Sequence, residues 1–128
     1  EAFVDRARRN RKLFGGAMRQ AGMIAGPGLL ALENVDRLAE DHENARRLAE
    51  GLNDVPGLSV PTPDTNIVMV DSAGADLTGD EFADLCHDAG IQCGAFSPTT
   101  VRLCTHLDVS RSDVAEAVER IAQAMDAA

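Results

Sequence analysis

Aromatic residues are scarce in this sequence. Its 128 residues include no tryptophan and no tyrosine, and phenylalanine alone makes up the 3% of aromatic residues. Single-stranded nucleic acids are commonly bound by stacking bases on aromatic side chains, so this composition argues against such a partner. Long apolar runs are also missing, and none approaches the roughly 20 residues of a membrane-spanning helix. No membrane partner is therefore predicted.

Cysteine is limited to three residues, Cys86, Cys93 and Cys104. An odd number without a Cys-x-x-Cys spacing suggests neither a disulfide framework nor a zinc site, and no metal site is predicted. Free thiols fit a reducing compartment, so we expect a cytoplasmic protein. Cys86 falls on the apolar face of a predicted helix and the other two fall in predicted strands. We interpret all three as packing residues.

Lysine is represented by Lys12 alone, and the charges are unevenly distributed. The net charge is −9, yet the first 20 residues carry six of the 12 basic side chains and only two of the 21 acidic ones. The acidic body argues against nucleic acid as a partner. The basic segment 6–19 could bind phosphate or nucleic acid, but its cations spread around a predicted helix. We favour the alternative, an interdomain or intersubunit helix that faces an acidic surface.

Hydropathy patterning predicts two helical segments in the first part of the chain. The first covers residues 2–14, and Gly15-Gly16 should end it. The second covers residues 18–53, and Gly26-Pro27-Gly28 should interrupt or kink it, because an interior proline removes a backbone hydrogen bond. Gly51 and the Pro56-Gly57 pair should then end the helical pattern. The remaining predicted elements are strands over 58–60, 66–70, 91–96 and 100–105 and helices over 79–89 and 110–125.

This order of elements predicts an α+β fold in which a small, mostly antiparallel sheet is backed by helices. The strand at 66–70 is apolar on both faces and should be central in the sheet. Strands 91–96 and 100–105 should form a hairpin. The length is typical of one domain. We divide the chain into a basic helix at 1–16, which is an interdomain or intersubunit element, and a small α+β domain at 17–128.

Arg102 interrupts an otherwise apolar strand. Alternation places it with Cys104 on one face and Val101 and Leu103 on the other. A strand arginine that precedes a turn is suited to hold a carboxylate through two parallel hydrogen bonds. Most charged residues are simply solvated, however, and the pattern alone favours an arginine that pairs with a local acid.

The three histidines have no evident catalytic partner in the sequence. His87 and His106 could act as general bases or metal ligands. We favour a simpler interpretation, in which His106 is a turn residue that bonds to backbone and His87 likewise has no catalytic role. His42 lies between two acids and should face solvent. No catalytic residue is assigned to this chain.

Four segments together resemble the low-specificity L-threonine aldolases, which are pyridoxal-phosphate enzymes of the aspartate-aminotransferase fold. They are RARRNRKLFGGAMRQAG at 6–22, DRLAEDHENA at 36–45, TNIV at 65–68 and VRLCTHLDVSR at 101–111. The family typically has a third glycine where this chain has Ala17. A Cβ there would restrict the loop if the position requires a positive φ.

The resemblance implies that the chain is the C-terminal part of such an enzyme and that the large cofactor-binding domain is missing. The Schiff-base lysine would lie in that domain, so Lys12 is not that lysine and no covalently bound cofactor is expected. Arg102 matches the arginine that holds the substrate α-carboxylate. Lys12 and Arg19 match basic residues near the active-site mouth, where they could reach the cofactor phosphate of a neighbouring subunit.

The implied parent enzyme is a cytoplasmic homo-oligomer, a dimer or tetramer, that cleaves L-threonine or L-allo-threonine into glycine and acetaldehyde by a retro-aldol reaction. The 128-residue chain alone is expected to be inactive. An alternative is a stand-alone small-molecule-binding or regulatory module derived from this domain. A third hypothesis, nucleic-acid binding through residues 6–19, predicts an affinity that falls steeply with salt.

Overall fold

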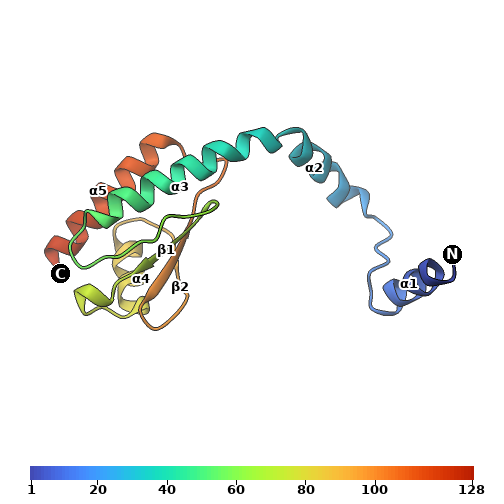
Figure 1. The fold of residues 1–128 in the computed structure, drawn as a ribbon, viewed down its shortest axis with the longest axis horizontal. Coiled ribbons are helices and arrows are strands. Elements are labelled where there is room, and N and C mark those ends of the chain that lie inside the picture. Colours follow the sequence, from blue (N-terminus) through green and yellow to red (C-terminus); the bar gives the residue numbers. More distant parts are fainter. The chain divides into compact units, whose positions relative to one another are not determined.

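The computed structural model describes all 128 residues, and their contacts divide the chain into two units, Glu1–Asp36 and Arg37–Ala128. The first unit contains α1 (Ala2–Leu13) and α2 (Gly22–Glu33) (Figure 1). None of its residues is buried within this unit. A short 3-10 helix, η1 (Val35–Arg37), follows α2. The contact boundary thus falls after Asp36, whereas the sequence suggested a division after residue 16. The assignment of residues 1–16 to an interface stays a prediction.

α1 confirms the first predicted helix, and the glycine pair ends it as expected. Gly15 adopts a φ of +77°, a conformation that side-chain-bearing residues rarely take. The chain then folds back so closely that a Cβ on Gly16 would lie 2.9 Å from Cγ of Arg11. Ala17 has no positive φ, so its Cβ causes no backbone strain. The family's third glycine is therefore not required by this backbone.

The sequence predicts that Gly26-Pro27-Gly28 interrupts or kinks the helix, and the structure shows no interruption there. Pro27 lies inside α2, which continues to Glu33. One missing backbone hydrogen bond weakens a helix at that point but does not have to end it. The helical pattern instead breaks at Asn34, whose side-chain amide donates a 2.7 Å hydrogen bond to the carbonyl oxygen of Leu30. Such a local bond between side chain and backbone competes with continuation of the helix.

The second unit is an antiparallel sheet packed against helices, which confirms the α+β prediction. Its helices are α3 (Leu38–Asn53), η2 (Ala73–Ala75), α4 (Gly79–Asp88) and α5 (Arg111–Ala127). Its strands are β1 (Ile67–Asp71), β2 (Gly94–Ala95) and β3 (Thr100–Cys104), in the order β1-β3-β2. α3 and α4 pack against the strands, and α5 packs against both helices (Figure 1).

The sheet differs from its prediction in two respects. β3 is central, whereas β1, the strand expected in the centre, has β3 on one side and only an isolated bridge from Asp71 to Ser59 on the other. The predicted strand at 58–60 is reduced to that bridge. The hairpin of β2 and β3 is confirmed, with Gly94 opposite Arg102. In β1, Val68 and Val70 are fully buried, whereas Ile67 is exposed and Met69 is half-buried, so the other elements of this unit leave its outer face partly open.

One continuous core joins the sheet to the three long helices. Its strand residues are Val68, Val70, Val101 and Leu103, and its helix residues include Leu48, Leu52, Phe82, Ile121 and Cys86. Gly51, expected to help end α3, lies within this helix and permits close packing instead. A Cβ there would lie 2.7 Å from a methyl group of Val118 on α5. The requirement for glycine is therefore tertiary, and α3 continues to Asn53.

The starts of α4 and α5 are each fixed by a capping residue that directly precedes the helix. The Thr78 hydroxyl accepts a hydrogen bond from the backbone N–H of Glu81, whose carboxylate accepts one from the N–H of Thr78. Ser110 and Asp113 make the same reciprocal pair at the start of α5. These hydrogen bonds lower the pKa of both acidic side chains by favouring their charged forms. Both helix starts are thus fixed by local sequence.

Candidate carboxylate-binding site

Arg102 lies in the middle of the central strand, on the face of the sheet that the helices of the same unit leave uncovered. Burial along β3 alternates as the sequence predicted: Val101 and Leu103 point into the core, whereas Arg102 and Cys104 are exposed. The Arg102 guanidinium forms no salt bridge and no side-chain hydrogen bond in the structure. The expected pairing with a local acid is therefore not observed. All the hydrogen-bond donors of the guanidinium remain available to an anion.

The strand that carries Arg102 is firmly anchored at its end. Thr105 is buried, and its hydroxyl donates a 2.6 Å hydrogen bond to the carbonyl oxygen of Asp41 on α3. The Asn66 side-chain amide donates to the carbonyl oxygen of Thr105 at 2.7 Å, and the Thr105 N–H donates to that of Asn66 at 3.0 Å. These bonds link β3, the start of β1 and α3. They hold the backbone of Arg102 in one position, which a recognition residue requires.

The two strands beside Arg102 leave unequal space around it. Met69 on β1 is its partner on one side, and Gly94 on β2 is its partner on the other. A Cβ added to Gly94 would meet nothing within 4 Å, so the β2 side is open. A glycine inside a strand often marks a place where a ligand approaches closely. Sequence reasoning gave Gly94 no role, although its position within a predicted strand was a usable signal.

The three thiols differ from one another. Cys86 is buried, which confirms its packing role, and burial raises its pKa well above the usual range. Cys93 is half-buried, and burial also raises its pKa. Cys104 is exposed on the same face as Arg102, so its interpretation as a packing residue is wrong for this chain. Alternation along β3 places Cys104 on the face opposite the core. This local geometry decides its exposure, whereas the general tendency of cysteine to be buried suggested the wrong interpretation.

We expect an alkylating reagent at pH 8 to modify Cys104 before the other two thiols. Reaction requires an accessible thiolate, and Cys86 has neither exposure nor an ordinary pKa. Peptide mass spectrometry over time would identify the order. The Cys104→Ser variant should lose the fast phase and keep the slow ones. A fast phase at Cys86 would contradict the core described above.

Lys12 and Arg19 belong to the unit Glu1–Asp36 and are exposed. Lys12 lies in the last turn of α1, and Arg19 lies in the turn before α2. Neither forms a salt bridge. Their role beside a cofactor phosphate stays a prediction.

The histidines do not form a catalytic arrangement. Nε2 of His87 lies 2.9 Å from the carbonyl oxygen of Cys93, and Nδ1 of His106 accepts a 3.3 Å hydrogen bond from the N–H of Asp108. His106 therefore bonds to backbone in a turn, as predicted. His42 is half-buried rather than fully solvent-facing. No group of three or more histidine, cysteine or acidic side chains is placed to hold a metal ion.

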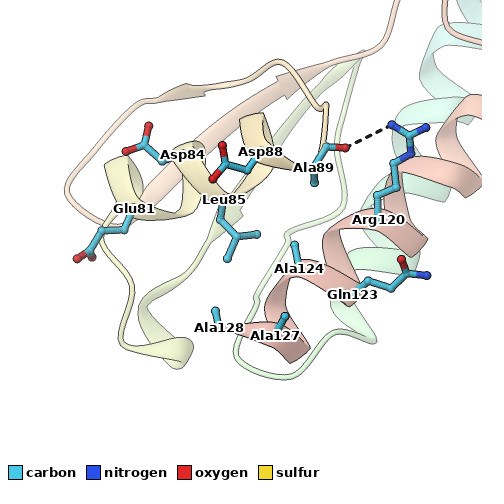
Figure 2. A pocket seen from close by; sticks show the side chains of 10 residues that line it. All are labelled: Glu81, Asp84, Leu85, Asp88, Ala89, Arg120, Gln123, Ala124, Ala127 and Ala128. Atoms are coloured by element: carbon cyan, nitrogen blue, oxygen red, sulfur yellow. Dashed lines mark hydrogen bonds between the residues drawn. The ribbon is translucent and has the colours of Figure 1, made fainter.

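A large groove between α4 and α5 has the wrong charge for an anionic ligand. Its volume is about 740 Å³, and Figure 2 shows Glu81, Asp84 and Asp88 along its α4 side. Its one cation, Arg120, donates a 3.3 Å hydrogen bond to the carbonyl oxygen of Ala89. Three carboxylates would repel a substrate carboxylate or a phosphate. Arg102 therefore remains the better anion site.

The sequence matches a family of known proteins. The family model for beta-eliminating lyases matches residues 1–75, which is more than half of the chain. The chain belongs to the beta-eliminating lyase family. The resemblance carried by the sequence motifs is thereby confirmed. None of the helices of this family member is both long enough and apolar enough to cross a membrane.

Two curated relatives are low-specificity L-threonine aldolases. The chain is 33% identical to low-specificity L-threonine aldolase 1 of Arabidopsis thaliana over 98% of its own length and 36% of the relative's. It is 43% identical to the low specificity L-threonine aldolase of Escherichia coli K12 over 89% of its own length and 33% of the relative's. This beta-eliminating lyase chain thus spans about a third of the length of these relatives.

A solved structure supports the fold assignment. The aspartate aminotransferase from Rhizobium meliloti matches 71% of this chain and 26% of its own chain, with a TM-score of 0.61 and 23% sequence identity. At 23% sequence identity the match supports the fold assignment and nothing further. It agrees with the small α+β domain expected from the sequence.

Proposed function

We propose that this chain is part of a pyridoxal-phosphate-dependent threonine aldolase that cleaves L-threonine or L-allo-threonine into glycine and acetaldehyde. In this proposal Arg102 binds the α-carboxylate of the substrate. The observation that carries it is the unpaired guanidinium on an anchored central strand, in a chain 33–43% identical to low-specificity L-threonine aldolases. The greater length of these relatives gives no support to a stand-alone binding module.

Arg102 would serve this reaction by orientation. A guanidinium forms two parallel charge-assisted hydrogen bonds with a carboxylate, which fixes both the position and the rotation of the bound group. The scissile Cα–Cβ bond is one bond removed from that carboxylate. Fixing the carboxylate therefore limits the directions in which the scissile bond can point, and correct orientation accounts for a large part of enzymatic rate enhancement. The open side next to Gly94 gives the substrate a route to the guanidinium.

This chain does not form a complete cofactor site. Its one lysine, Lys12, lies on α1. The resemblance to threonine aldolases places the Schiff-base lysine before this segment, so we propose that Lys12 is not that lysine. Pyridoxal phosphate would supply the electron sink for carbon–carbon cleavage when bound by the complete protein. We propose that Lys12 and Arg19 contribute positive charge near its phosphate. The remaining groups would come from the part of the protein outside these residues.

The proposed enzyme is a cytoplasmic homo-oligomer whose basic residues 1–16 contact an acidic surface of another domain or subunit. The high density of arginine on α1 supports this interface, since a helix with so few apolar positions gains little from packing on an apolar core. The cytoplasmic compartment is proposed because the thiols are free.

Comparing the complete gene product with the 128-residue chain tests this function. The complete protein with added pyridoxal phosphate should release glycine and acetaldehyde from L-threonine. The isolated chain should release neither and should not develop the visible absorbance of bound cofactor. Absence of cleavage by a folded, cofactor-loaded complete protein would refute the aldolase assignment. Cleavage by the isolated chain would refute the view that other parts of the protein are required.

A further inference from the structure

Two hydroxyl groups are the most deeply buried polar side chains of the unit Arg37–Ala128. Ser72 is 0% exposed and Thr105 is 1% exposed, whereas the other buried polar side chains retain at least 5% exposure. Burying a polar group costs free energy unless it forms hydrogen bonds, so a fully buried hydroxyl indicates a specific contact. Each of these two hydroxyls is therefore expected to hold a particular piece of backbone.

The two residues lie at opposite ends of the pairing between β1 and β3. Ser72 directly follows β1, and its backbone N–H donates a 2.9 Å hydrogen bond to the carbonyl oxygen of Thr99, just before β3. Thr105 directly follows β3, and its N–H donates to the carbonyl oxygen of Asn66, just before β1. Arg102 lies halfway between Thr99 and Thr105 in the sequence. The strand segment that carries the guanidinium is thus held at both ends.

The Ser72 hydroxyl links its end of the strand pair to the segment that leads into α4. Its oxygen lies 2.9 Å from the carbonyl oxygen of Thr99 and 3.0 Å from that of Leu77, and its one hydrogen can donate to either. α4 also holds the turn before β3 directly, because the N–H of Gly79 donates a 2.7 Å hydrogen bond to the carbonyl oxygen of Pro98. This end of the strand pair is therefore tied to the start of one helix.

The Thr105 hydroxyl makes the corresponding link to α3, through its hydrogen bond to the carbonyl oxygen of Asp41. Hydrogen bonds between β1 and β3 keep the two strands in register, but they do not stop the pair from shifting together across the helices. Apolar contacts in the core are non-directional and resist such a shift only weakly. A directional hydrogen bond at each end fixes the position of the pair.

We propose that Ser72 and Thr105 are positioning residues that act through Arg102. Their hydroxyls fix β3 between α3 and α4, and thereby fix the point at which the guanidinium meets the substrate carboxylate. The proposal rests on the proposed function, in which Arg102 binds that carboxylate. The two hydroxyls do not touch the substrate themselves, because both are enclosed, whereas Arg102 is exposed. A small displacement of a group that orients the substrate is enough to lower the rate of reaction.

Removing each hydroxyl in the complete protein tests this proposal. Ser72→Ala and Thr105→Val should each lower kcat/KM for L-threonine by about 3–10-fold, the effect of losing one neutral hydrogen bond. KM should rise and kcat should fall, which is the same pair of changes that a displaced guanidinium would cause. Thr105→Ser keeps the hydroxyl and should restore most of the loss seen in Thr105→Val. Equal losses in the two Thr105 variants would overturn the role of the hydroxyl.

Asn53→Ala is the matched control. The Asn53 side chain makes two hydrogen bonds to the backbone of Val60, at 2.7 Å and 2.9 Å. Asn53 is the last residue of α3, whereas Asp41 lies in its first turn. The variant should lose at least as much stability to urea as Ser72→Ala, yet keep kcat/KM within about twofold. A loss of kcat/KM in Asn53→Ala as large as that in Ser72→Ala would show a merely structural role and overturn the proposal.

A double substitution separates this proposal from the proposed function. Since Ser72 acts through Arg102, adding Ser72→Ala to Arg102→Lys should lower kcat/KM by less than about twofold. An effect as large as in the parent protein would overturn the proposal. If Arg102→Lys lowers kcat/KM and Ser72→Ala does not, the positioning role fails while Arg102 keeps its own. If Arg102→Lys changes nothing, carboxylate binding by Arg102 fails, and the positioning role fails with it.

The dissociation constant of glycine gives the same comparison without turnover, because glycine carries the same carboxylate. Ser72→Ala should raise it by about 3–10-fold, and Asn53→Ala should leave it within about twofold. A complete protein that shows this difference but cleaves no threonine would retain the positioning role and reject the aldolase assignment. A complete protein that binds no glycine and cleaves no threonine would overturn both.

Discussion

Replacing Arg102 with lysine in the complete protein should lower kcat/KM for L-threonine by about 10–150-fold. A hydrogen bond to a charged group contributes roughly 1.5–3 kcal/mol, and lysine cannot reproduce the paired geometry of the guanidinium. Both kinetic constants should change. KM should rise because a binding contact is lost, and kcat should fall because the substrate is less well oriented. Steady-state kinetics of acetaldehyde release would measure both.

Arg46→Lys is the control for this experiment. Arg46 lies on α3 and pairs with Glu43 in an exposed salt bridge, a type of contact that contributes little. Its variant should retain kcat/KM within about twofold. The Arg102→Lys protein should also unfold at the same urea concentration as the parent, because the exposed side chain of Arg102 packs into no core. Unchanged kinetics in the Arg102→Lys protein would remove Arg102 from the site.

Phe82→Ala should be the most destabilising single substitution tested in the 128-residue chain. Phe82 is 0% exposed and is the largest of the fully buried side chains. Truncating a buried phenylalanine typically costs 3–5 kcal/mol, through lost burial and the cavity that remains. Domains of this size are stable by only about 5–15 kcal/mol. The variant should therefore unfold at a much lower urea concentration and be partly unfolded near body temperature.

Phe96→Ala is the matched control, because it removes the same side chain from a position that is 65% exposed. Its free energy of unfolding should change by no more than about 0.5 kcal/mol. Urea titrations followed by far-ultraviolet circular dichroism would give both values with equal slopes. Similar costs at the two positions would mean that Phe82 is not the centre of the core.

Most helix ends and the alternation of the central strand could be predicted from the sequence, because interactions between neighbouring residues specify them. Thr78 with Glu81 and Ser110 with Asp113 mark two helix starts through side-chain hydrogen bonds to nearby backbone. Gly15 marks the end of α1 because it takes a positive φ. Alternation along β3 placed Arg102 opposite the core for a similar reason, since the direction of a strand side chain depends only on its position.

The errors concern features that depend on distant neighbours. Gly51 interrupts no helix, because its small size serves the contact with Val118 of α5. β1 is not the central strand, since strand order depends on which segments pair and not on how apolar each one is. The opening beside Arg102 arises from the pairing of Gly94 with Arg102, a register that neither segment specifies alone.

The sequence by itself determined the family, the α+β class and the position of Arg102 on the uncovered face of a strand, because motifs, caps and alternation are local properties. Only the tertiary structure decided which strand is central and that the Arg102 guanidinium has no acidic partner in its own unit. Burial and pairing are set by contacts between residues far apart in the chain, and the order of amino acids encodes those contacts only collectively.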